Sequence, residues 1–143
     1  MTPVRGVILL TMLGALCGPP AAAAQTARAA HADPTITSMR MRTTGHDPGA
    51  HYYVRVQIRL RICAVRGRAS VAFHETKRIG GNTFGSHRRS RRLRQTAACQ
   101  TRTFNWRLRQ EFFGIGTYRV AAAVRDRDGH TSRTVSRKQT TND

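Results

Sequence analysis

The sequence predicts an all-β protein, an antiparallel sandwich of two sheets. Two observations lead to this prediction. Apolar and polar residues alternate with a period of two along most of the chain, as they do in half-buried strands, whereas helical periodicity is scarce. Turn-forming residues punctuate the alternating segments at short intervals, at 47–49, 80–82 and 114–116. Six or seven short strands joined in this way are typical of a sandwich.

The N-terminus has the composition of a cleavable export signal. Arg5 supplies positive charge, and residues 7–17 form an apolar run that is too short to span a bilayer. Small residues then place the cleavage site after Ala24. We expect residues 1–24 to be the signal peptide, and the remaining chain to be secreted or associated with the cell surface, with no membrane span. We further expect a flexible leader at 25–33 and one folded domain at 34–140.

The strongest strand signal covers residues 53–65. Val56, Ile58 and Leu60 share one face, and arginines occupy much of the other. The same alternation predicts strands at 35–42, 69–78, 101–109, 117–125 and about 131–138. Asp128-Gly129 is a hairpin signal between the last two of these. The arginine-rich segment Ser86 to Arg94 is expected to be an exposed loop.

Two cysteines, Cys63 and Cys99, remain after removal of the signal. In an exported protein two thiols most often form one disulfide. If they join directly facing antiparallel strands, then Ile58 lies opposite Phe104 and Val56 opposite Trp106, so that the two apolar faces coincide. The same register sets Arg55 opposite Arg107, which is a like-charge pair.

The chain is strongly basic, with a formal net charge of +18 and 25 Lys and Arg against 7 Asp and Glu. Such a domain binds polyanions at low salt. Arginine pairs bidentately with phosphate and carboxylate, although a GC-rich genome also encodes arginine in place of lysine. Arg40 and Arg42 are predicted to face outward. The candidate anion-binding residues are Arg55, Arg59, Arg61, Arg88, Arg89, Arg91, Arg92, Arg94, Arg107 and Arg109.

The C-terminal residues carry a resemblance. Gly116-Thr-Tyr118-Arg-Val120, followed by Val124-Arg-Asp126-Arg-Asp128-Gly129-His-Thr-Ser132, resembles the last two strands of immunoglobulin-like and fibronectin type III-like domains of exported actinobacterial proteins. The resemblance implies an immunoglobulin-like sandwich of about seven strands, in which the strands at 53–65 and 101–109 are neighbours. It also implies that Tyr118 is a tyrosine corner, whose hydroxyl bonds nearby backbone.

No catalytic or cofactor signature appears in the sequence. His74 and Glu75 are adjacent on a predicted strand, so their side chains point to opposite faces and cannot form a dyad. The Asp126–Gly129 segment is interpreted as a hairpin turn rather than a calcium loop, and the six histidines lack ligand spacing. We therefore predict no enzyme activity, no metal site and no cofactor.

The function predicted from these features is that of an exported, non-catalytic binding or accessory module for acidic polymers of the cell envelope or surroundings. Nucleic acid would bind only non-specifically. The alternative is a scaffold or protein-interaction domain whose charge is incidental. A third hypothesis, copper carriage, rests on a similarity to exported copper carriers at His31-Ala32 and in fold class, and it requires His31 to be the first mature residue.

Overall fold

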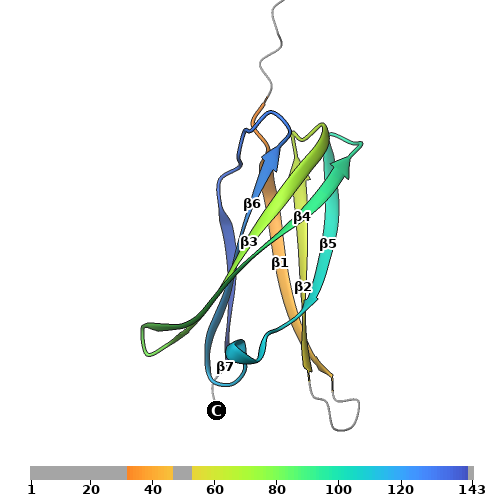
Figure 1. Cartoon of the computed structure of the whole chain (residues 1–143). Coiled ribbons are helices and arrows are strands. Elements are labelled where there is room, and N and C mark those ends of the chain that lie inside the picture. Colours follow the sequence, from red (N-terminus) through yellow and green to blue (C-terminus); the bar gives the residue numbers. More distant parts are fainter. Residues whose placement is uncertain (1–31, 47–52, 142–143) are drawn as a thin grey trace, which may run out of the picture.

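Alternating residues along the chain form strands throughout the computed structural model, which describes residues 32–46 and 53–141. Two antiparallel sheets lie face to face (Figure 1). The three-stranded sheet has the order β1-β2-β5 and the four-stranded sheet the order β4-β3-β6-β7. A single-turn helix, η1 (Gln110–Phe112), follows β5. The strands of the described part are β1 (Thr35–His46), β2 (Tyr53–Cys63), β3 (Gly67–Ile79), β4 (Asn82–Gln95), β5 (Cys99–Arg107), β6 (Gly116–Asp126) and β7 (Val135–Thr141).

The central strand of the three-stranded sheet buries the apolar face that the sequence predicts. Val56, Ile58, Leu60 and Ile62 of β2 are each 0% exposed. The strand ends at Cys63 rather than at residue 65, because Ala64 has a φ of 60° and turns the chain out of the extended conformation.

The predicted register between β2 and β5 is confirmed. Cys63 lies opposite Cys99, and the pairing continues through Ile58 opposite Phe104 to Arg55 opposite Arg107. A disulfide joins the two cysteines. The expectation that these two strands are neighbours in one sheet is confirmed as well.

The prediction of a loop at Ser86–Arg94 is wrong. This segment lies within β4, which pairs with β3 from Gly67 opposite Gln95 to Ile79 opposite Asn82. Gly80 and Gly81, both with positive φ, form the tight turn between the two strands. β4 shows no alternation of apolar and polar residues, because polar residues occupy most positions on both of its faces. The hairpin tip projects away from the sandwich (Figure 1).

The C-terminal strands also differ in detail from the prediction. β7 begins at Val135 rather than near 131, and the preceding segment makes only an isolated bridge between Arg125 and Thr131. A hydrogen bond from the Asp126 amide to the His130 carbonyl (3.0 Å) closes the predicted turn. β1 extends beyond the predicted end at 42. The proposed turn at 47–49, the signal peptide and His31 lie outside the described residues.

The core fills the space between the two sheets. Phe73 of β3 lies at 5.1 Å, between ring centroids, from both Phe104 and Trp106 of β5, so that aromatic rings bridge the sheets. From the four-stranded sheet, Tyr118, Val120, Ala122 and Val124 of β6 point into the same core, as predicted. No helix of the described part has the length and apolar character needed to cross a membrane.

Candidate anion-binding surfaces

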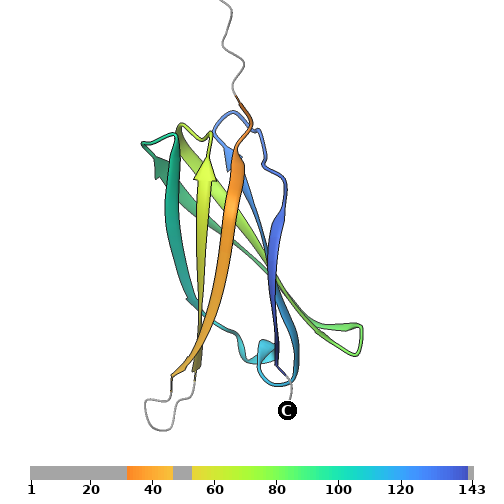
Figure 2. The ribbon, with the colours of Figure 1, turned by 180° about the vertical axis from the view of Figure 1, so that it is seen from behind.

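The outer face of the three-stranded sheet carries aligned arginines. Figure 2 views the molecule from the side of this sheet. Because directly paired residues share a face, the strand pairing places Arg40 of β1 beside Arg59 of β2, and Arg55 of β2 beside Arg107 of β5. All of these side chains are exposed. We call the following set the arginine face: Arg40, Arg42, Arg55, Arg59, Arg61 and Arg107.

The strands that carry the arginine face provide no acidic residue to balance it. Neither β1, β2 nor β5 contains an aspartate or a glutamate. Like charges directly opposite one another on a sheet are destabilising. The Arg107 guanidinium relieves part of this cost by stacking 4.4 Å above the Tyr53 ring centroid. The face is therefore a region of concentrated positive charge with much of its hydrogen-bonding capacity open to solvent.

A small polar hollow marks one end of the arginine face. It has a volume of about 230 Å³. Guanidinium groups from two strands surround it together with hydroxyl groups, all of which can donate hydrogen bonds to an oxyanion. Its lining residues are Ser38, Arg40, Arg59, Arg61 and Thr101. The chemistry of this hollow suits a phosphate, sulfate or carboxylate group.

The predicted arginines of segment 86–94 lie elsewhere. Arg88, Arg92 and Arg94 are exposed on the outer side of β4, in the four-stranded sheet. The two outer faces of a sandwich point in opposite directions, so these three residues cannot join the arginine face on one surface. Arg91 lies opposite Val71, on the inward side of β4, but remains exposed at the sheet edge.

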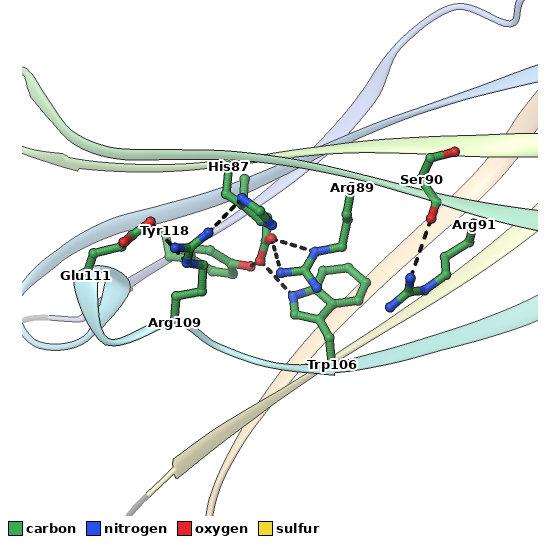
Figure 3. Close-up of polar contacts among 9 residues, drawn as sticks. His87, Arg89, Ser90, Arg91, Trp106, Arg109, Glu111 and Tyr118 are labelled. Carbon is green, nitrogen blue, oxygen red and sulfur yellow. Dashed lines mark hydrogen bonds and ion pairs between the residues drawn. The ribbon is translucent and has the colours of Figure 1, made fainter.

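Arg89 turns into the interior, in contrast to its predicted role. Its guanidinium forms an ion pair with Glu75 of β3, with Nε at 2.7 Å and a terminal nitrogen at 2.5 Å from Oε2. The Arg89 side chain is 14% exposed and that of Glu75 is 0% exposed. The guanidinium also lies 4.6 Å above the Trp106 ring (Figure 3). These contacts leave Arg89 unsuited to bind an external anion.

Glu75 is the centre of a buried polar cluster. Besides Arg89, it accepts a hydrogen bond from Trp106 Nε1 (2.6 Å) and another from the hydroxyl of Tyr118. The implied tyrosine corner is therefore wrong, because the Tyr118 hydroxyl bonds a side chain from β3 rather than nearby backbone. Burial, followed by the hydrogen bond and charge of Glu75, raises the pKa of Tyr118 far above its ordinary value.

Sequence reasoning missed this cluster although a signal was present. Glu75 falls two residues after Phe73, and Lys77 two residues later, so both share the inward face of β3. A charged residue at an inward position predicts a buried partner. His74, in contrast, points outward and bonds the Ser86 hydroxyl (2.8 Å), which confirms that His74 and Glu75 occupy opposite faces.

Arg109, the last predicted site residue, is partly engaged at the edge of the cluster. Its guanidinium lies 3.0 Å from His87 Nδ1 and 3.4 Å from a Glu111 oxygen (Figure 3). Both side chains of the Arg109–Glu111 pair are about half exposed. Arg109 thus lies between the buried cluster and the solvent, rather than on the arginine face.

In the turn after β6, the Asp126 carboxylate is bound by a residue of the same turn. Asp126 accepts hydrogen bonds from the His130 backbone (2.9 Å) and ring Nδ1 (3.1 Å). Burial acts to raise the pKa of Asp126, but the hydrogen bonds and charge of His130 outweigh it, so the pKa lies below the ordinary value. Within residues 32–46 and 53–141, no three histidine, cysteine or acidic side chains gather to hold a metal ion.

Comparisons with known proteins give backbone similarities only. No protein family model matches the sequence, and no curated protein sequence matches it either. A putative β-galactosidase from Bacteroides fragilis matches at 15% identity, with a TM-score of 0.46 over 76% of this chain and 17% of that one. A β-glucuronidase from Bacteroides uniformis matches at 13% identity and a TM-score of 0.46, over 76% of this chain and 14% of that one. The chain thus spans less than a fifth of either enzyme.

Proposed function

We propose that the chain is an exported, non-catalytic fibronectin type III-like or immunoglobulin-like domain that binds acidic polymers through its arginine face. The strand order supports this domain type. In constant-type immunoglobulin domains the fourth strand joins the sheet of the first, second and fifth strands. Here β4 joins β3, β6 and β7 instead, which favours the fibronectin type III-like alternative.

One observation carries the binding proposal: the arginine face lies on three strands that contain no carboxylate. If the arginines resulted only from a basic composition, we would expect arginine and acidic side chains to be mixed on the same strands. In this chain the buried acids Glu75 and Asp126 have partners in the fold and do not balance the face. An extended polyanion relieves the repulsion between neighbouring guanidinium groups by bringing its own charges and releasing counterions.

The partner in this proposal is an acidic polymer of the cell envelope or surroundings, which bears phosphate or carboxylate groups. The spacing across the sheet suits a polymer. Adjacent strands lie about 4.8 Å apart, so arginines on β1, β2 and β5 can meet successive charges. The predicted export signal would deliver the chain to the compartment where such polymers occur.

Binding to defined polyanions tests the proposal. Inorganic polyphosphate and polygalacturonate serve as probes for the two acidic groups, with affinity measured by fluorescence anisotropy. In the face variant, Arg40, Arg59 and Arg61 are replaced by Gln. In the matched control, Arg88, Arg92 and Arg94 are replaced by Gln, so that the same charge is removed from the opposite sheet.

We expect the face variant to bind at least one probe about tenfold or more weakly, a difference of ~1.4 kcal/mol, and the control to change far less. Equal losses in the two variants would show that net charge alone determines binding, which favours the alternative of incidental charge. Arg89 stays unchanged in both variants, because its loss would disrupt the buried ion pair with Glu75.

A further inference from the structure

η1 and the loop before β6 lie together at one end of the sandwich (Figure 1). Residues of both line a second cavity. Its volume is about 230 Å³. Apolar side chains form its walls, among them Val54, Leu108, Phe112 and Phe113. The side chains with polar groups in the lining are Lys77, Gln139, Thr43, Tyr118 and Thr141. This cavity shares no lining residue with the arginine face.

Lys77 is the unusual member of this cavity. It occupies an inward position on β3 and is 3% exposed. Its ammonium group donates a hydrogen bond to the Phe113 carbonyl. The ion pairs among the described residues belong instead to Arg89, Arg109 and His130. Lys77 is thus a buried cation whose described partner is a neutral carbonyl, although an ammonium group has three donors.

The nearest acidic position along the strand cannot satisfy Lys77. Glu75 already accepts bonds from Arg89, Trp106 and Tyr118. Burying an ammonium group without an anionic partner costs free energy, which a bound anion would offset. The cavity therefore offers a positive group for which residues 32–46 and 53–141 provide no anionic partner.

Gly114, in the loop before β6, and Gly116, the first residue of β6, bring the backbone close to Lys77. Gly114 and Gly116 have φ values of 80° and 124°, which side-chain-bearing residues rarely adopt. A Cβ atom on Gly116 would lie 3.3 Å from Lys77 Cε and 2.6 Å from the Arg78 carbonyl oxygen. Only glycine lets the chain pass so close. Gly114 and Gly116 both line the cavity beside Lys77.

Gln139 provides a second donor on the other wall. Thr43 Oγ1 donates a hydrogen bond to Gln139 Oε1 (2.7 Å), which leaves the amide nitrogen of Gln139 as a donor. Lys77 and Gln139 thus add one charged and one neutral donor to a cavity that Val54, Leu108, Phe112 and Phe113 line on their apolar sides. Such a set matches an anion with two oxygens on an apolar body.

We propose that this cavity binds a small organic carboxylate, with the carboxylate on Lys77 and the apolar body among Val54, Leu108 and Phe112. The volume equals that of about eight water molecules at ~30 Å³ each, so the ligand is of benzoate size. This site goes beyond the proposed function, because it uses a different surface and an apolar contact that a polyanion lacks.

The chain permits a direct test, because Lys77 and Lys138 are its only lysines. In protein labelled with ¹³C at lysine Cε, each lysine gives one side-chain NMR signal. During titration with benzoate, the Lys77 signal should move and saturate, whereas the exposed Lys138 signal should stay in place. Benzamide, the neutral analogue, should bind at least tenfold more weakly. A shift that does not saturate, or equal binding of benzamide, would overturn the proposal.

Variants separate the site from the rest of the molecule. Lys77→Met should abolish benzoate binding, whereas Lys138→Met, the matched control, should leave it unchanged. If Lys77→Met does not fold, Leu108→Phe fills the cavity while retaining the lysine, and it should also lose binding. Retention in either folded variant would refute the site. The face variant should bind benzoate like the original chain, so failure here and failure of polyanion binding are distinguishable.

Discussion

Replacing Glu75 by Gln should destabilise the fold strongly, because it removes the only carboxylate in the buried cluster. The side chain is 0% exposed and accepts bonds from Arg89, Trp106 and Tyr118. Glutamine has nearly the same shape, so the change tests charge and hydrogen bonding rather than volume. Arg89, 14% exposed, would keep a charge with no counterion.

The magnitude follows from the class of interaction. Breaking a buried ion pair by removal of one partner costs about 3–5 kcal/mol, because an uncompensated charge stays in the interior. With a urea m-value of about 2 kcal/mol per molar, the unfolding midpoint should fall by ~2 M. Urea unfolding followed by Trp106 fluorescence measures this shift, since Trp106 lies in the core against Arg89.

The Glu111→Gln variant is the matched control. Glu111 faces Arg109 at 3.4 Å, but its side chain is 43% exposed, and exposed pairs contribute about 1 kcal/mol or less. The double variant Glu75→Gln/Arg89→Met should recover part of the loss, because it removes the unpaired charge. A midpoint shift for Glu75→Gln as small as that for Glu111→Gln would refute the described cluster.

Three further predictions concern other parts of the fold. Replacing Cys63 and Cys99 by Ser should lower the free energy of unfolding by about 4 kcal/mol, because the disulfide joins residues separated by 36 positions. Calorimetry measures this change, and an unchanged unfolding midpoint would contradict the prediction. Because the pKa of Asp126 is lower in the folded state, Asp126 contributes stability above its unfolded-state value of about 3.8, and this contribution is lost as pH falls through the folded pKa. Asp126→Asn should thus be less stable near pH 6, with the gap closing below pH 4 in urea unfolding; a gap that does not vary with pH would refute this. Gly81→Val should destabilise the β3–β4 hairpin by ~1–2 kcal/mol, since Gly81 has a φ of 90°. Amide hydrogen exchange at the hairpin tip should become faster, and unchanged exchange would contradict the prediction.

Much of the fold was predictable because burial follows a simple period. The alternation in β2 and β6 reflects one face against the core, and the two cysteines fixed the pairing of β2 with β5. β4 was missed for a physical reason. Its inward face carries His87, Arg89 and Arg91 in place of apolar residues, so the strand has no apolar period to detect.

The candidate sites were predictable only in part. The residues of the arginine face lie outward because their neighbours along each strand are buried, and this follows from alternation alone. The inward turn of Arg89 depends on Glu75, which is 14 residues away and becomes its neighbour only through the β3–β4 pairing. The Lys77 cavity likewise requires η1 and the loop before β6, whose positions no local pattern reveals.

The salt dependence of polyphosphate binding tests the central claim most directly. Each arginine–phosphate contact releases counterions and adds about 0.7–0.9 to the slope of log K against log salt concentration. Removing Arg40, Arg59 and Arg61 together should reduce this slope by ~2–3, whereas removing Arg88, Arg92 and Arg94 should leave it nearly unchanged. Equal slopes for the original chain and the face variant would contradict the assignment of polyanion binding to the arginine face.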